Sequence, residues 1–176
     1  SAQAATQTVT VKATVEQWMT FSASPTAVSL TPPLVTAAGG VAIGSSTNVT
    51  MDLGTNSATW NITIMGAKGG LATSTYDLIE SVATGTVAST TLSAGTDGYG
   101  AQATTTAVGI TIDARYNKWG TNTVAAIAST TSQQMVNGTS TASVTVAAMK
   151  IRAACDSAQP AGIYSDTVTL TATGGT

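Results

Sequence analysis

The chain has 176 residues, enough for one domain with a buried core, and its six basic and eight acidic side chains give a net charge of −2. Charged residues make up 8% of the sequence, against about 25% in ordinary soluble domains. The few basic residues argue against nucleic-acid binding, the absence of His removes the commonest general base and zinc ligand, and no apolar run is long enough for a membrane-spanning helix.

Residue usage predicts the fold class. Val, Ile and Thr together account for 60 residues, about a third of the chain, and their branched side chains suit a pleated strand better than a helix. Low apolar content raises the question of disorder, but disorder also requires a high net charge, which this chain lacks. We therefore expect a folded, all-β protein.

The first predicted element covers residues 6–21. Small or apolar residues alternate there with Thr and Lys, which is the period of a strand with one apolar face. The alternation is interrupted at Glu16 and Gln17, so we expect a bulge or bend at that point. The apolar face of the leading segment contains Val9, Val11, Ala13 and Val15.

Two clearer strands follow at residues 48–53 and 59–65. Val49, Met51 and Leu53 share one phase of the first strand, and Trp60 starts the apolar phase of the second, so that its indole is expected in the core. Residues 54–57 look like a turn. The pattern predicts a hairpin of these two strands.

The second half of the chain predicts more short strands. Residues 76–81 and 85–92 are weak candidates, residues 108–112 a strong one, and residues 122–132 could instead form a short helix. Asn137-Gly138 is a two-residue hairpin signal, followed by a strand at 143–152 with Val144, Val146 and Ala148 facing inward. A last strand covers 163–173. Nine or ten short strands favour a two-sheet β-sandwich of jelly-roll or immunoglobulin-like type.

The ionisable residues predict no catalytic site, metal or cofactor. The eight carboxylates are dispersed, and nothing in their spacing selects an acid and base pair. Two alternatives stay open for calcium, at Asp97 in its Gly-rich loop or at Asp113 near Asn117. Cys155 has no intrachain partner, so we expect a small buried hydrophobe, with pairing between subunits as the alternative.

Surface features predict few partners. Three sequons, at Asn48, Asn61 and Asn137, lie on polar phases or in a turn and could accept glycans. Trp119 is the aromatic residue most suited to facing a partner, with packing under its loop as the alternative. The chain opens without Met, which we interpret as a processed end whose export signal has been removed, and we expect a protein outside the cell, at the cell surface.

The leading strand allows two interpretations. It could complete its own sheet, or it could complete the sheet of a neighbouring copy, with its apolar face filling a groove. A head-to-tail interface of the second kind does not close and therefore propagates into a fibre. The scarcity of charge favours this association, because edge lysines normally prevent strand pairing.

Three stretches resemble a known group of proteins. The opening TVTVKATVEQWMTFSASP (8–25), the GTDGYG loop (95–100) and the closing QPAGIYSDTVTLTAT (159–173) are similar to secreted β-sandwich surface proteins of archaea and bacteria. These include bundling-pilus and TasA-type biofilm-fibre subunits and, more distantly, spore-coat and chaperone-usher pilins. The single Cys155 departs from the disulfide usual in chaperone-usher pilins. The resemblance covers about a third of the chain and implies a filament subunit whose donor strand spans Val9 to Val15.

The resulting expectation is a donor strand at 1–15 and a β-sandwich domain at 16–176. We expect a non-enzymatic subunit of a pilus or biofilm-matrix fibre, a head-to-tail homopolymer formed by donor-strand complementation that supports adhesion and contacts surface glycans or neighbouring filaments. The first alternative is a monomeric module that binds carbohydrate. The second is a hydrolase with an aspartate pair.

Overall fold

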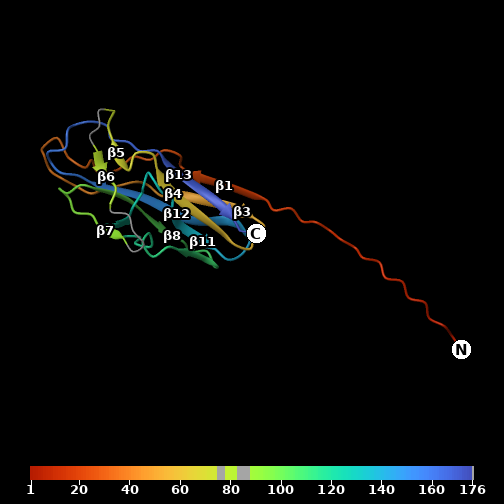
Figure 1. Ribbon diagram of the computed structural model, residues 1–176. Coiled ribbons are helices and arrows are strands. Elements are labelled where there is room, and N and C mark those ends of the chain that lie inside the picture. The colour runs from red at the N-terminus through yellow and green to blue at the C-terminus, as the bar shows by residue number, and fades with distance from the viewer. Residues whose placement is uncertain (75–77, 83–87, 176) are drawn as a thin grey trace.

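The chain folds into a β-sandwich with a long N-terminal tail (Figure 1). The computed structural model describes residues 1–74, 78–82 and 88–175. All regular structure in this part of the chain is β-strand, arranged in two large sheets and one small one. The expected all-β, two-sheet sandwich is confirmed.

The first sheet has the strand order β1, β3, β12, β8, β10, β7, and β2 pairs with one end of β12. All its ladders are antiparallel. The bounds are β1 (Met19–Ser24), β2 (Gly44–Ser45), β3 (Val49–Thr55), β7 (Ser89–Thr91), β8 (Gly98–Thr104), β10 (Thr123–Ala125) and β12 (Ala142–Ala154).

The second sheet has the antiparallel order β13, β4, β11, β9, and two short strands pair apart from it as β5 and β6. The bounds are β4 (Trp60–Gly66), β5 (Gly70–Ala72), β6 (Leu78–Glu80), β9 (Ile110–Ile112), β11 (Gln133–Gly138) and β13 (Val168–Gly174). β1 is an edge strand of the first sheet and β13 an edge strand of the second.

The predicted alternation of β3 and β4 is confirmed. Every second residue of each strand is buried, and these side chains meet in one core cluster between the sheets. A fully buried Val, Leu, Ile or Met contributes about 1.5–3 kcal/mol to folding. The central residues of this row are Val49, Met51, Leu53, Trp60, Ile62 and Ile64.

The predicted hairpins are wrong. β3 pairs with β1 and β12, whereas β4 pairs with β13 and β11, so the connection between β3 and β4 crosses from one sheet to the other. The chain after Asn137-Gly138 crosses in the same way, from β11 to β12. Both strands of each pair carry one apolar face, and a crossing lets the two faces meet in the same interior.

Three further expectations are corrected. Val144 is 54% exposed while Val146 and Ala147 are buried, because an irregularity between Thr145 and Ala147 shifts the register of β12 against β3. Residues 123–125 form β10, so the helix alternative is wrong. The last strand begins at Val168 instead of 163. The weak candidates at 76–81 and 85–92 lie partly outside the described residues, and their described parts contain β6 and β7.

Candidate functional site: an exposed tail and an open groove

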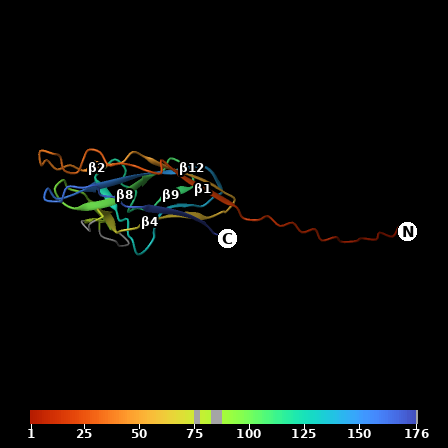
Figure 2. The ribbon, with the colours of Figure 1, turned by 90° about the horizontal axis from the view of Figure 1, so that it is seen from above.

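Residues 1–17 form an extended tail that leaves the sandwich at one end (Figures 1 and 2). Within the described residues the tail pairs with no strand, and the ladder starts only at Met19. Val9, Val11 and Val15 are 81%, 86% and 86% exposed, and Ala13 is exposed as well. The tail thus carries a row of apolar side chains in solvent, and its function as a donor strand stays a prediction.

Side-chain hydrogen bonds hold residues 16–18, the root of the tail, to the body. Asn56 Nδ2 donates to the carbonyl oxygen of Glu16 over 2.8 Å, and Asn56 Oδ1 accepts from the Trp18 N–H over 2.9 Å. Gln17 Nε2 donates to the carbonyl oxygen of Gly175 over 3.0 Å and also contacts the Ser57 hydroxyl. These contacts bring the start of β1 and the end of β13 together, and they fix where the tail begins.

The inward-facing side chains of the edge strands β1 and β13 are incompletely covered. β3 and β4 alternate with fully buried residues, but the inward rows of β1 and β13 are only half-buried. Each of these edge strands pairs on one side alone in the described ladders, which leaves backbone donors and acceptors unused on the other. The half-buried side chains that pack on the core there are Met19, Phe21, Ala23, Val168, Leu170 and Ala172.

An open, mostly apolar groove continues from this edge toward the end opposite the tail. It has a volume of about 690 Å³, and its walls are the segment that follows β1 and the segment that precedes β13. Side chains from the core strands form its floor. The apolar lining includes Val28, Leu30, Leu34, Val35, Leu71, Ile79, Ile151, Tyr164 and Val168. The groove offers the surface that an apolar strand would cover.

One polar cluster lies at the floor of the groove. Asp166 Oδ1 accepts the backbone N–H groups of Ala67, Lys68 and Thr167 over 2.8–3.1 Å, and Asp166 Oδ2 accepts from the Tyr99 hydroxyl over 3.3 Å. Burial and, to a smaller extent, the Asp166 charge raise the pKa of Tyr99 well above its usual value. The phenol therefore stays protonated, and the carboxylate holds a turn together.

Cys155 also lines the groove. Its side chain is buried, and desolvation, followed by the charges of Asp97 and Asp156, raises the pKa of the thiol. A protonated thiol is a poor nucleophile. The residue lies where the sequence interpretation of a small buried hydrophobe places it, and pairing between subunits would require that the groove open further.

The carboxylates considered for calcium have other partners. Asp113 forms a two-pronged ion pair with Arg115, whose hydrogen bond lowers the pKa of that carboxyl. Asp97 accepts the backbone N–H of Asp156. Among residues 1–74, 78–82 and 88–175 the side chains bring no three potential metal ligands together.

The three sequons occupy different surroundings. Asn48 is exposed just before β3, where a glycan would meet little obstruction. Asn61 and Asn137 are half-buried and lie directly opposite each other on β4 and β11. Residues opposite in an antiparallel pair have Cβ atoms about 5 Å apart, so two glycans there would collide.

The aromatic residues do not form a common platform. Trp60 is buried as expected and donates its indole N–H to the carbonyl oxygen of Ser140 over 2.8 Å. Trp119 is half-buried, and the Lys150 ammonium lies 4.8 Å from its ring centre, which occupies that face. Trp18 is 51% exposed at the root of the tail. The three indoles lie in separate places.

The sequence reasoning missed the groove itself. Its walls at residues 28–37 and 159–166 have no strand period, because each is an irregular segment with two isolated bridges at most. A usable signal was present, since Pro32, Pro33 and Pro160 interrupt these segments while Leu30, Leu34 and Ile163 keep them apolar. Apolar loops flanking two edge strands indicate a surface that needs a cover.

Comparison with protein-family models, with characterised proteins and with solved structures finds no match to this chain. No helix in the described part of the chain is long and apolar enough to cross a membrane.

Proposed function

We propose that this chain is a secreted, non-enzymatic structural subunit of an extracellular filament, which supports attachment or biofilm formation. Residues 1–15 of one subunit complete the β-sandwich of the next by donor-strand complementation. The observation that carries the proposal is the coexistence, in one chain, of an unpaired apolar strand segment, two edge strands that each pair on one side in the described ladders, and an open apolar groove between the segments that adjoin those edge strands.

The apolar face of the tail matches the apolar lining of the groove. Val9, Val11, Ala13 and Val15 recur with the period of a strand, so a strand placed in the groove points all four side chains inward. Each buried Val contributes about 1.5–3 kcal/mol. Backbone hydrogen bonds to an open edge add affinity without depending on sequence, as in other cases of strand addition.

The length of the tail suits the same purpose. Fifteen residues in extended conformation reach about 50 Å, and a seven-residue strand such as β13 spans about 23 Å. The tail can therefore follow β13 and continue along the apolar wall that precedes it.

The composition fits a repetitive extracellular assembly. Only 8% of the residues are charged, so neighbouring subunits repel each other weakly. The outward phase of β13 carries Thr169, Thr171 and Thr173, which are polar without charge and leave the edge open for pairing. The alternative of a carbohydrate-binding module has less support, because the three indoles lie apart and Lys150 covers one of them.

The test is to delete residues 1–15 and compare the product with the full chain by negative-stain electron microscopy and analytical ultracentrifugation. We expect the full chain to form filaments and the truncated chain to form no filaments of normal length. The contacts of the body with the chain before β1 come from Glu16, Gln17 and Trp18, which the truncation keeps. Filaments of normal length from the truncated chain would overturn the proposal, as would a full chain that stays monomeric under all conditions of assembly.

A further inference from the structure

We propose that the outward face of the first sheet, beside the root of the tail, is a subsite for one uncharged sugar residue of an extended glycan. The indole of Trp18 contacts the apolar face of the sugar ring, and Asp52 with the hydroxyl groups beside it binds the sugar hydroxyls. This inference rests on the proposed function in one respect, because it names the chemical class of surface to which the filament attaches.

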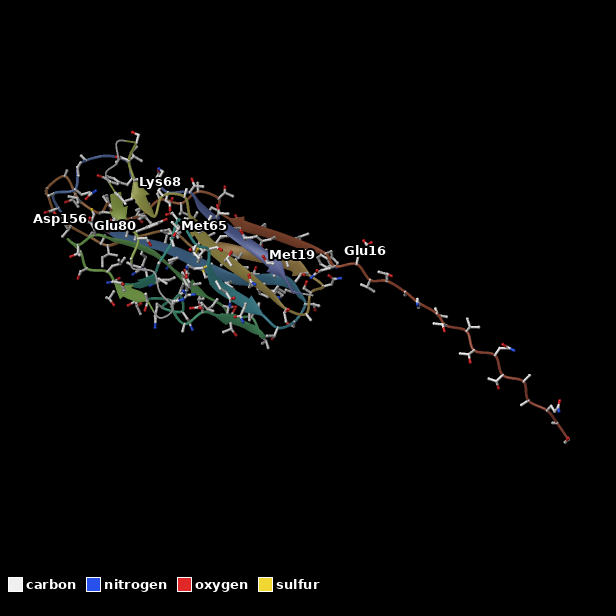
Figure 3. The ribbon with its side chains drawn as sticks, in the orientation of Figure 1. Glu16, Met19, Met65, Lys68, Glu80 and Asp156 are labelled. Carbon is white, nitrogen blue, oxygen red and sulfur yellow. The ribbon has the colours of Figure 1, made fainter. Side chains whose placement is uncertain are left out.

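The indole of Trp18 points into solvent. Trp18 lies between Glu16 and Met19, which are labelled where the tail meets the sandwich (Figure 3). Successive side chains of an extended chain point to opposite faces, and Met19 packs on the core, so the indole of Trp18 points outward. It is 51% exposed, and its N–H has no partner within the residues that the structure describes. An indole of this kind offers an apolar face and a hydrogen-bond donor.

The neighbouring strand makes room for this indole. Gly54 of β3 lies opposite Thr20 of β1, and a Cβ atom added at Gly54 would lie 3.1 Å from Cζ3 of Trp18. The six-membered ring therefore rests against a strand position that has no side chain. This packing supports the indole on one side and leaves the rest of its surface open to a ligand.

An open depression of about 360 Å³ adjoins the strand positions against which the indole rests. Across its floor Ser22, Asp52 and Thr145 lie side by side on β1, β3 and β12, and all three are exposed. The lining includes Thr20, Ser22, Asp52, Gly54, Val144 and Thr145. Hydroxyl groups and one carboxylate thus lie next to exposed aromatic carbon, which matches a sugar ring with its apolar C–H face and its rim of hydroxyls.

Asp52 has an unused acceptor. Its Oδ1 atom accepts from the Thr145 hydroxyl over 2.5 Å, and its Oδ2 atom has no hydrogen-bond partner among the described residues. No Lys or Arg in the described part of the chain forms an ion pair with it. Hydrogen bonds to an ionised acceptor are about twice as strong as those between neutral groups, so this carboxylate is suited to bind hydroxyl donors.

The charges at this site favour an uncharged sugar. Asp52 is exposed, and Glu16, two residues before Trp18, is exposed as well. The nearest basic residue along the tail is Lys12, six residues before Trp18. The two carboxylates oppose sugars that carry carboxylate or sulfate groups. Cationic ligands are typically held in a cage of several aromatic rings, whereas Phe21, the next aromatic residue of β1, packs on the core.

Repetition along the filament compensates for a small site. One indole and one carboxylate bind a single sugar weakly, but each subunit of a filament repeats them. A glycan with repeated residues then engages several copies, and the resulting avidity exceeds the affinity of one site by orders of magnitude. The distance between Trp18 and the other indoles weakens the case for a module that acts alone, and it does not weaken the case for this subsite.

Titration of the full chain with neutral hexasaccharides of glucose, xylose and N-acetylglucosamine tests the subsite. Calorimetry gives the dissociation constant per subunit. Acrylamide quenching of tryptophan fluorescence reports mainly on Trp18, because Trp60 is buried and Lys150 covers one face of Trp119. We expect at least one of these sugars to bind and to reduce the quenching, with an affinity that changes little with salt, since the ligand carries no charge.

Trp18→Ala is expected to weaken this binding about tenfold, and Trp18→Phe, which keeps an aromatic ring, to weaken it less. The hydrogen bonds at the tail root use the backbone N–H and carbonyl oxygen of Trp18, so both variants keep them. Asp52→Asn should weaken binding about fivefold through loss of a charged acceptor. Trp119→Ala is the matched control, since it removes a half-buried indole elsewhere, and its dissociation constant should stay within about twofold of the original.

The remaining outcomes contradict the inference. If none of the hexasaccharides binds, or if Trp18→Ala binds as well as Trp119→Ala, the indole of Trp18 serves packing and no sugar. If choline or an oligogalacturonate binds instead, with an affinity that falls steeply as salt is added, the ligand is charged. Failure of the proposed function is recognised separately, because sugar affinity per subunit does not depend on assembly, which sedimentation measures in the same samples.

Discussion

Gln17 Nε2 donates a 3.0 Å hydrogen bond to the carbonyl oxygen of Gly175, which lies 158 positions further along the chain. The contact ties the last residue of the tail to the last described residue after β13. Together with the bond from Asn56 to the Glu16 carbonyl oxygen, it fixes the root of the tail to the sandwich, whereas the residues before Glu16 belong to no described strand ladder. In the proposed filament, a tail that leaves at a fixed point would meet its neighbour in a defined orientation, which a regular filament requires.

Val11→Asp is expected to block assembly. In the donor interpretation Val11 points into the groove, and burying an unpaired carboxylate there costs several kcal/mol, on the order of a thousandfold in affinity or more. The measurement is the critical concentration for assembly, obtained by sedimentation of filaments.

Thr10→Asp is the matched control for this variant. It adds the same charge one residue away, on the phase that faces solvent in a paired donor, so its critical concentration should stay within a few-fold of the original. Equal effects of the two variants would mean that the tail does not present one face to a groove.

A peptide with the sequence of residues 1–17 is expected to stabilise the truncated subunit. Because the peptide binds the folded body and has no site on the unfolded chain, a concentration one hundred times its dissociation constant adds about 2.7 kcal/mol and raises the melting temperature. Differential scanning fluorimetry measures the rise. A peptide with Val11→Asp should give none, and equal shifts from both peptides would indicate nonspecific binding.

The core strands could be predicted from the sequence, and their partners could not. A period of two in β3 and β4 assigns each residue to a face, because successive side chains of a strand point to opposite sides. Whether the chain then turns back in the same sheet or crosses to the other depends on which apolar face it meets. Asn137-Gly138 has the composition of a tight hairpin turn, yet burial of Gly138 against Trp60 favours the crossing.

The candidate site, too, could be predicted only in part from the sequence. Its strand period was visible in Val9 to Val15, but the period alone does not say which sheet a strand joins. The groove depends on two irregular segments at residues 28–37 and 159–166, whose positions are set by long-range packing. Local patterns therefore identified the apolar period of the tail and missed the groove.

Gly138→Ala is expected to destabilise the fold. A Cβ atom at this position would overlap the indole of Trp60, which is buried and hydrogen-bonded to the Ser140 carbonyl oxygen and cannot move freely. Overpacking of this kind costs about 1–3 kcal/mol. Urea denaturation measures the loss of unfolding free energy, provided that the slope of this free energy against urea concentration is the same for both proteins.

Gly40→Ala is the control for the glycine substitution. Gly40 is exposed, and the nearest atom to an added Cβ is the Thr36 hydroxyl oxygen at 3.2 Å. The free energy of unfolding should change by about 0.5 kcal/mol or less. A Gly138→Ala variant as stable as Gly40→Ala would mean that the crossing between β11 and β12 does not pack as described.

Cys155 is expected to report occupation of the groove. The thiol lines the groove and its pKa is raised by burial, so alkylation by iodoacetamide should be slow near neutral pH in the truncated subunit and should accelerate as the pH rises. In filaments the donor covers the same wall, and the reaction should be slower still. Equal rates in the two states would contradict occupation of this groove.

Asp113→Asn is expected to reduce stability in a pH-dependent way. Arg115 donates to both carboxylate oxygens, over 2.8 and 3.0 Å, and lowers the pKa of Asp113 in the folded state. A carboxyl group with a lowered pKa adds stability above its ordinary pKa, and this contribution is lost as the pH falls through the folded-state pKa. Because both side chains are partly exposed, the contribution is about 1 kcal/mol. Urea denaturation at pH 7 should therefore show the variant less stable by this amount, and the difference should shrink as the pH falls below the ordinary pKa of an Asp side chain and through the lowered pKa of Asp113. A difference that stays constant over this range would mean that the charge of Asp113 adds nothing to its hydrogen bonds.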